Sequence, residues 1–204
     1  MPSAPGPIQP VTVSLIAYEP EGILRGAIEL RHDRTSHMLE EGDPLPVFYA
    51  ARERHSDGSI THMGRLEVPQ RELVIVLVTG PDLDLARRPL AQARCVRITV
   101  AGYSVTGRVL VPPGREPGPA SADRGWLAVT EVLLRYHARG AERAHLHEAV
   151  LVNGSLVESI VPVDAADQEQ EHRAAEARIR AGWREREYDR LPLPLAWVAA
   201  SGTP

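Results

Sequence analysis

One pattern occurs twice in this chain, and it limits the possible folds more than any other feature. Residues 95–111, CVRITVAGYSVTGRVLV, form two alternating apolar runs around a Gly-Tyr-Ser centre. Residues 11–30, VTVSLIAYEPEGILRGAIEL, repeat the same order of strand, tyrosine, loop, glycine and strand. Alternation of apolar and polar residues is typical of strands with one buried face. Each stretch therefore predicts a pair of strands joined by a short connection.

The rest of the chain supports a duplication. We align Tyr18 with Tyr103 and, after a loop of different length, Gly26 with Gly107. Further strand-forming runs separated by turn signals follow each copy. The predicted fold is mainly β, with two tandem five-stranded small barrels or rolls and a C-terminal α-helix; the alternative is one fused β unit. The predicted boundaries are a leader at 1–10, a first β-module at 11–79, a linker at 80–94, a second β-module at 95–163, a charged helix at 164–190 and an apolar, proline-containing tail at 191–204.

The C-terminal region has a different composition from the two modules. Asp164 can cap the N-terminus of a helix in which Glu169 and Arg173 form an i,i+4 pair. The apolar stripe of this helix is thin, and the tail that follows, LPLPLAWVAASGTP, is apolar. An apolar tail indicates a contact surface, either on the chain's own modules or on a partner. The predicted partner-binding residues are Ile179, Trp183 and Trp197.

Charge and cysteine content narrow the possible functions. The net charge is -4, and all 23 basic residues are arginine. A duplex nucleic-acid binder normally carries a basic excess, so nucleic acid is not an expected partner. The single cysteine, Cys95, excludes an internal disulfide and a cysteine-based zinc site. We find no signal peptide and no apolar run of about 18 residues, and therefore expect a cytoplasmic protein without a membrane span.

Three histidines are the candidate metal ligands. His145 and His147 are two residues apart on a predicted strand and so share a face, and His137 lies across the predicted hairpin. Three imidazole nitrogens are a known ligand set for zinc. The alternative is a solvated face of an edge hairpin, and we expect no cofactor.

Four arginines beside the central loop of the first module are the candidate ligand-binding residues: Arg31, Arg34, Arg52 and Arg54. Guanidinium groups bind phosphate through paired hydrogen bonds, so this group could clamp a nucleotide or another anionic ligand. No Walker A sequence, no GxGxxG and no Gly-x-Ser-x-Gly elbow accompany it. The sequence therefore names no catalytic residue.

The second half carries a more extended pattern. Its parts are a Val-rich strand ending in Gly102-Tyr103, a second strand with central Gly107, the loop Val111-Pro112-Pro113-Gly114, and the segment Val152-Asn153-Gly154-Ser155. This pattern resembles an uncharacterised bacterial β-module of unknown function, and the first half fits it less well. The resemblance implies a compact, partly closed five-stranded barrel or roll, similar to Sm or SH3-like barrels. It implies no activity, because a fold does not fix a function.

Three functions remain open. The first is a non-enzymatic interaction or assembly protein, which binds a protein partner or itself through the β-modules and the helical tail. Exposed strand edges would provide its pairing sites. The second is a sensor that binds a nucleotide or other anion through the arginine-rich loops. The third is a metal-dependent hydrolase at the three histidines. We expect the first, and no enzymatic activity.

Overall fold

The computed structural model describes residues 11–30, 38–39, 42–79, 92–114, 117 and 125–185, except for the side chains of 78–79 and 182–185. The predicted leader at 1–10, most of the predicted linker, the last residues of the predicted helix and the predicted tail lie outside these residues. So do Arg31, Arg34 and Trp197.

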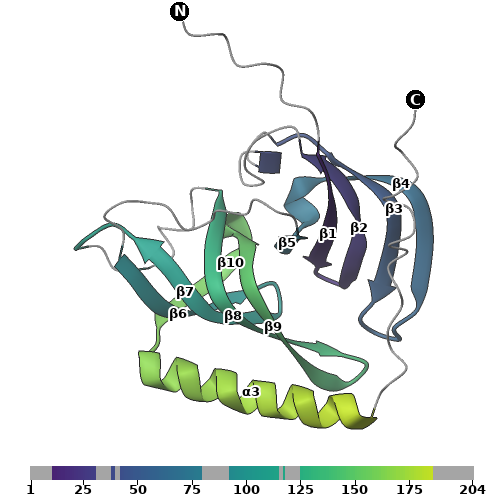
Figure 1. Cartoon of the computed structure of the whole chain (residues 1–204). Helices are drawn as coiled ribbons and strands as arrows, with labels where there is room; N and C mark the ends of the chain where they lie inside the picture. The colour runs from purple at the N-terminus through teal and green to yellow at the C-terminus, as the bar shows by residue number, and fades with distance from the viewer. Residues whose placement is uncertain are drawn as a thin grey trace, which may run out of the picture.

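Ten antiparallel strands form one open sheet, in the order β10-β6-β7-β8-β9-β5-β1-β2-β3-β4 (Figure 1). The first half contains β1 (Val11–Glu19), β2 (Gly22–Leu30), β3 (Leu45–Arg54), β4 (Ile60–Val68), the 3₁₀ helix η1 (Gln70–Glu72) and β5 (Ile75–Thr79). The second half contains β6 (Gln92–Val100), β7 (Tyr103–Val111), β8 (Trp126–Ala138), β9 (Ala141–Asn153), the 3₁₀ helix η2 (Gly154–Leu156) and β10 (Val157–Pro162), and the helix α3 (Ala165–Glu185) follows. The mainly β fold with a C-terminal helix is confirmed.

Both halves have the same internal plan. The strand order is β5-β1-β2-β3-β4 in the first half and β10-β6-β7-β8-β9 in the second, and a 3₁₀ helix precedes the last strand of each. The alignment of Tyr18 with Tyr103 is wrong. Glu19 pairs with Gly22 across the first turn, and Val100 pairs with Tyr103 across the second. Tyr103 is therefore the counterpart of Gly22, whereas Tyr18 lies on the strand before the turn.

A bulge at the same place in each half explains two of the glycines. The backbone of Tyr49 in β3 and of Glu131 in β8 has a positive φ, 52° and 50°. The pairing register shifts beside each of them, opposite Gly26 and Gly107. A Cβ atom at Gly26 would lie 2.4 Å from a valine methyl, and one at Gly107 would lie 2.6 Å from another. Only glycine therefore lets the bent strands approach each other this closely.

Neither half closes into a barrel, so the prediction of two tandem barrels is wrong and the alternative of one fused β unit describes the molecule. The outer edge of β5 pairs with β9 of the other half, through Ile75 with Val152 and Val76 with Leu151. An edge that is occupied in this way cannot close onto β4. The sheet consequently runs without interruption from β10 to β4.

The two halves curl around opposite faces of the sheet. Val76 belongs to the core of the first half, whereas its neighbours Ile75 and Leu77 belong to the core of the second half. Leu151 of β9 is likewise part of the core of the first half. The central strand β5 is therefore buried on both faces, which explains why its sequence is almost entirely aliphatic.

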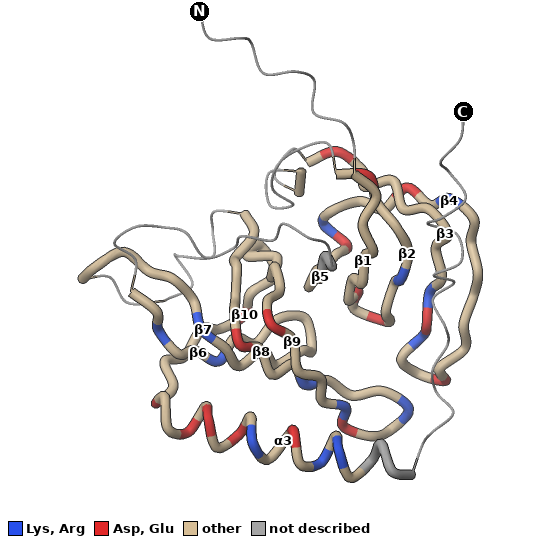
Figure 2. Tube along the Cα trace, viewed as in Figure 1, with Lys and Arg blue, Asp and Glu red and all other residues tan. Residues whose placement is uncertain are grey.

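α3 lies along the outer side of the β6–β10 half (Figure 1). It faces the sheet with buried Gln168 and Ala175, and Glu171 forms ion pairs with Arg97 of β6 and Arg135 of β8. Acidic and basic residues are interspersed along its length (Figure 2). In the described part of the chain, no helix is long and apolar enough to cross a lipid bilayer.

Candidate functional site

Six ring side chains meet where the two halves join, and we call them the junction cluster. Their neighbouring ring centroids are 4.9 to 6.3 Å apart, within the range in which aromatic rings attract one another. The chain has only five tyrosines, and three of them are in this cluster. The members are Tyr18 of β1, His55 after β3, Tyr103 of β7, Tyr136 of β8, and His145 and His147 of β9.

The β8–β9 hairpin brings half of the cluster to the junction. His145 pairs with Leu134, and side chains alternate along a strand, so Tyr136, His145 and His147 share one face of the hairpin. β8 and β9 have 13 residues each, against 10 and nine for their counterparts β3 and β4. The extra length carries the hairpin across to the turn between β3 and β4.

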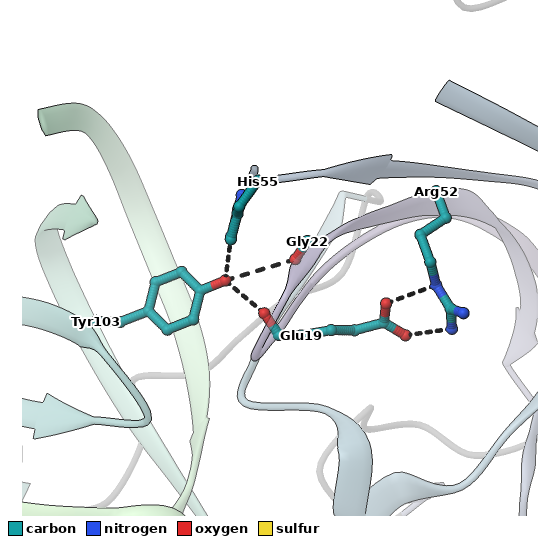
Figure 3. Close-up of polar contacts among 5 residues, drawn as sticks. All are labelled: Glu19, Gly22, Arg52, His55 and Tyr103. Atoms are coloured by element: carbon teal, nitrogen blue, oxygen red, sulfur yellow. Dashed lines mark hydrogen bonds and ion pairs between the residues drawn. The ribbon is translucent and has the colours of Figure 1, made fainter. Parts of the chain in front are cut away.

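The hydroxyl group of Tyr103 links the second half to a turn of the first (Figure 3). It donates a hydrogen bond to the carbonyl oxygen of Glu19 at 2.6 Å, and the carbonyl of Gly22 lies 3.4 Å away. Nε2 of His55 is 2.6 Å from the same hydroxyl oxygen. Because the only hydroxyl proton is directed at the carbonyls, His55 has to donate from Nε2. Tyr103 is 2% exposed, so these bonds are shielded from water.

Two further pairs complete the polar network. The hydroxyl of Tyr136 is 3.0 Å from Nε2 of His145, and the hydroxyl of Tyr18 is 3.4 Å from Nε2 of His147. Each of these pairs shares one hydrogen bond between a phenol and an imidazole. The cluster therefore satisfies most of its own polar groups.

Burial keeps the cluster uncharged at neutral pH. It raises the pKa of Tyr18, Tyr103 and Tyr136 above the ordinary value of a phenol. It lowers the pKa of His55 and His145, and burial together with the neighbouring His145 lowers the pKa of His147 to about 4. Neutral imidazoles and protonated phenols can exchange hydrogen bonds without burying an ion.

Charged residues surround the cluster. The backbone N–H of Arg139, in the β8–β9 turn, donates to the carbonyl of His55 at 2.7 Å, and its guanidinium lies 3.2 Å from the carboxylate of Glu53. Arg25 and Arg143 further lower the pKa of His145, whereas Glu53 raises it. The hairpin tip is thus bound to the first half by both backbone and side-chain contacts.

The three predicted metal ligands are not brought together. His137 pairs with Glu142, and the alternation along β8 places it on the opposite face of the hairpin from His145 and His147. Within the described ranges, no group of three or more His, Cys, Asp or Glu side chains is arranged to hold a metal ion. The prediction that His145 and His147 share a face is therefore correct, whereas His137 lies on the other face of the hairpin.

Carboxylates of the chain itself engage the two described members of the arginine group. Nε of Arg52 is 2.7 Å from the carboxylate of Glu19, and Arg54 is 3.9 Å from Asp57. Figure 3 draws the contact between Arg52 and Glu19. The other two members, Arg31 and Arg34, lie outside the described residues. The described geometry therefore contains no convergent arginine clamp.

The predicted partner-binding residues are spread over α3 and the tail. Ile179 is half-buried and lies one turn beyond Ala175, on the side of α3 that faces the sheet. Trp183 belongs to α3, but its side chain is outside the described part, as is all of Trp197. Their role stays a prediction.

Sequence reasoning missed the junction cluster, because its members come from five separate segments. One signal was present: aromatic residues make up only 4% of the chain, and three tyrosines stand near the turn ends of predicted strands. Comparisons with family models, with curated proteins and with solved structures give no match, so function has to be inferred from geometry.

Proposed function

We propose that this chain is a non-enzymatic interaction protein that binds an extended segment of a partner along the outer edge of β4. The observation that supports the proposal is the position of β4 at the end of the sheet. Among the described residues, no strand pairs with its outer edge. A free strand edge offers a row of backbone donors and acceptors to another chain.

The hydrogen-bonding pattern supports an accessible edge. The N–H of Arg54 donates to the carbonyl of Ser59 at 3.0 Å, which places Ser59 in a hydrogen-bonded pair with β3. Hydrogen-bonded and non-hydrogen-bonded pairs alternate in an antiparallel ladder. The backbone groups of Ile60 and His62 therefore point away from β3. β4 has nine residues and contains no proline.

Apolar side chains gather beside this edge. Tyr49 of β3 is 77% exposed and Ile60 of β4 is 40% exposed, and both are among the few large apolar side chains so exposed in the described chain. Met63 and Leu66 of β4 pack on the core of the first half but are only partly buried. A strand added to this edge would lie beside the β4 side chains Ile60, Met63 and Leu66, and covering apolar surface favours association. Tyr49 lies one strand further in.

The opposite end of the sheet is less suited to pairing. β10 has only six residues, its register with β6 shifts between Val157 and Ser159, and it ends at Pro162. Short length, irregular register and proline are features that protect strand edges from pairing. We therefore assign the interaction to β4.

The test is a variant that removes one outward donor. His62→Pro deletes an N–H that faces away from β3, so the sheet should keep its own bonds. The matched control, His62→Thr, changes the same side chain but keeps the N–H. Proteins retained by the immobilised wild-type chain are identified, purified and titrated against all three forms. We expect about tenfold weaker binding for His62→Pro, and near wild-type binding for His62→Thr. Equal affinity for all three forms contradicts the proposal.

A further inference from the structure

The helix α3 carries the chain from one side of the molecule to the tip of the β8–β9 hairpin. The chain enters α3 beside β6, where the N–H of Val163 donates to the carbonyl of Cys95 at 3.0 Å. Further along, Arg178 of α3 lines one groove together with Glu142, the second residue of β9. Figure 1 shows the C-terminal end of α3 below this hairpin. The last turns of the helix therefore lie at the hairpin tip.

The hairpin tip in turn contacts the loop that leads into β4. The guanidinium of Arg139 is 3.2 Å from the carboxylate of Glu53 and 3.4 Å from the carbonyl oxygen of Gly58. β4 begins at Ile60, two residues after Gly58. α3 continues for seven residues after Arg178, which is about 10 Å of helix. The described chain therefore ends on the side of the molecule where β4 begins.

The sequence that follows α3 contains a segment suited to strand pairing. Residues 191–204, LPLPLAWVAASGTP, carry no charge. Proline cannot donate to a strand ladder, so Pro192 and Pro194 confine regular pairing to the residues after them. The next residues, LAWVAA, contain no proline, and side-chain alternation would place Leu195 and Trp197 on one face of a strand. This short segment thus offers a backbone donor at every position and one strongly apolar face.

The connection is long enough for this segment to reach the free edge. Residues 186–194 separate the end of α3 from Leu195, and these nine residues span about 30 Å when extended. β4 also has nine residues and is about as long. A tethered segment competes for a site at an effective concentration in the millimolar range, whereas a free partner competes only at its own concentration. The chain's own tail is therefore the best placed occupant of this edge.

The first residues of β4 present a matching surface. The backbone groups of Ile60 and His62 point away from β3, and both residues are exposed. The two charged residues of β4, Arg65 and Glu67, lie further along the strand and pair with each other at 2.8 Å. An uncharged segment can therefore pair with the beginning of β4 without desolvating an unpaired charge of that strand.

We infer that residues 195–200 of this chain bind the outer edge of its own β4 at Ile60 and His62, and so cover the surface that a partner would use. This inference rests on the proposed function and adds its regulation, because tail and partner compete for one edge. If the segment alone has a Kd of about 0.1 mM, a local concentration of about 1 mM covers the edge about nine-tenths of the time. The apparent affinity for the partner then falls about tenfold.

Hydrogen exchange in the full-length chain tests the inference without a partner. The probes are the backbone amides of Ile60 and His62, whose exchange rates are measured by NMR. Trp197→Asp places a charge in the segment, so both amides should exchange about tenfold faster than in wild type. Ser201→Asp adds the same charge outside the segment and should leave both rates unchanged. The amide of Thr61 faces β3 and should exchange at one rate in all three chains.

Three results would overturn the inference. The first is equal exchange of the two amides in wild type and Trp197→Asp, because the tail then leaves the edge uncovered. The second is equal acceleration in Ser201→Asp, because the added charge itself then acts. The third is protection that rises with protein concentration, because a second copy then occupies the edge.

The proposed function is tested separately, with a partner retained by the immobilised chain. Trp197→Asp should bind this partner about tenfold more tightly than wild type. Since His62→Pro weakens the tail contact as well, its full effect on the partner appears in the Trp197→Asp background, where we expect about tenfold weaker binding. Equal affinity with and without His62→Pro in that background contradicts the proposed function but leaves the tail contact standing.

Discussion

The hairpins β3–β4 and β8–β9 occupy equivalent places in the two halves but differ in length, in their ring side chains and in the pairing of their far edges. β8–β9 is longer, carries Tyr136, His145 and His147, and places its far edge against β5. β3–β4 is shorter and contributes only His55 of its turn to the junction cluster, and among the described residues no strand pairs with the far edge of β4. The two halves have two similarly placed edges, and β5 pairs with one of them, the far edge of β9. The edge of β4 is the one at which we propose an external contact.

The outer faces of the halves differ in a related way. Glu53 and Arg135 each lie four residues beyond the bulge of their strand. Glu53 forms an ion pair with Arg139 of the hairpin tip, and Arg135 forms one with Glu171 of α3. At this equivalent position each half thus forms an ion pair with a neighbouring element. The residue at the position is acidic in the first half and basic in the second. At this position a hairpin tip contacts the first half and a helix contacts the second.

The largest effect is expected from filling the space beside the bulges. Gly26→Ala and Gly107→Ala would each place a Cβ atom within 2.8 Å of a backbone carbonyl as well as against a valine. We expect each to lower the free energy of unfolding by about 2–3 kcal/mol, measured by urea denaturation. Gly64→Ala is the control, since nothing lies within 4 Å of its Cβ position. A loss in only one of the two bulge variants would show that the bulges are not equivalent.

Removing one hydroxyl should weaken the junction next. Tyr103→Phe leaves the carbonyl of Glu19 and Nε2 of His55 without their buried partner. We expect a loss of about 2 kcal/mol in the free energy of unfolding. Tyr49→Phe removes the same atom from a side chain that is 77% exposed, and should cost almost nothing. Equal losses in the two variants would mean that the Tyr103 contacts add no stability.

Acidification should act on the same junction. The pKa of His147 is about 4 in the folded chain, below its ordinary value of 6.5, so the folded state binds fewer protons than the unfolded state between these values. The stabilisation is complete above pH 6.5 and is lost as the pH falls toward 4, by on the order of 1–2 kcal/mol. His147→Gln should flatten this part of the curve of unfolding free energy against pH, and His62→Gln, at an exposed position, should leave it steep. If the curve of unfolding free energy against pH keeps its slope in His147→Gln, the His147 imidazole is not the cause of the loss of stability in acid.

The smallest effect concerns the ion pair at the hairpin tip. Arg139→Ala removes the contact with Glu53, but the arginine side chain is 48% exposed and its backbone bond to His55 remains. We expect a loss of about 0.5–1 kcal/mol in thermal or chemical unfolding. Arg173→Ala, in the exposed i,i+4 pair with Glu169, should cost less, about 0.3 kcal/mol. The reverse order would indicate that the tip contributes nothing to the junction.

Much of the fold could be predicted from local pattern. The alternating runs identified the strands, and the composition change at Asp164 identified the helix. The register of the repeat was misjudged, because Tyr18 and Tyr103 look alike but lie on opposite sides of their turns. A tyrosine near a turn looks the same in the sequence whether it lies before or after that turn. The residue pairs across the turn show on which side it lies.

The open sheet and the site could not be predicted in the same way. Whether β5 pairs with β4 or with β9 depends on contacts between residues about 75 positions apart in the sequence, such as Val76 and Leu151. The face of His137 depends on the register of the β8–β9 ladder, and a change of one residue moves a side chain to the other face. The prediction of pairing at exposed strand edges did not say which strand lies at the end of the described sheet.

The burial of β5 on both faces has a consequence for biosynthesis. Ribosomes deliver the N-terminal half first, and one face and the outer edge of β5 have no cover until β9 has been made. During that interval the chain presents LVIVLVT, an uncharged aliphatic segment of the kind that pairs with its own copies. Successful synthesis then depends on how quickly the second half arrives, and slow translation or premature termination between the halves would favour aggregation.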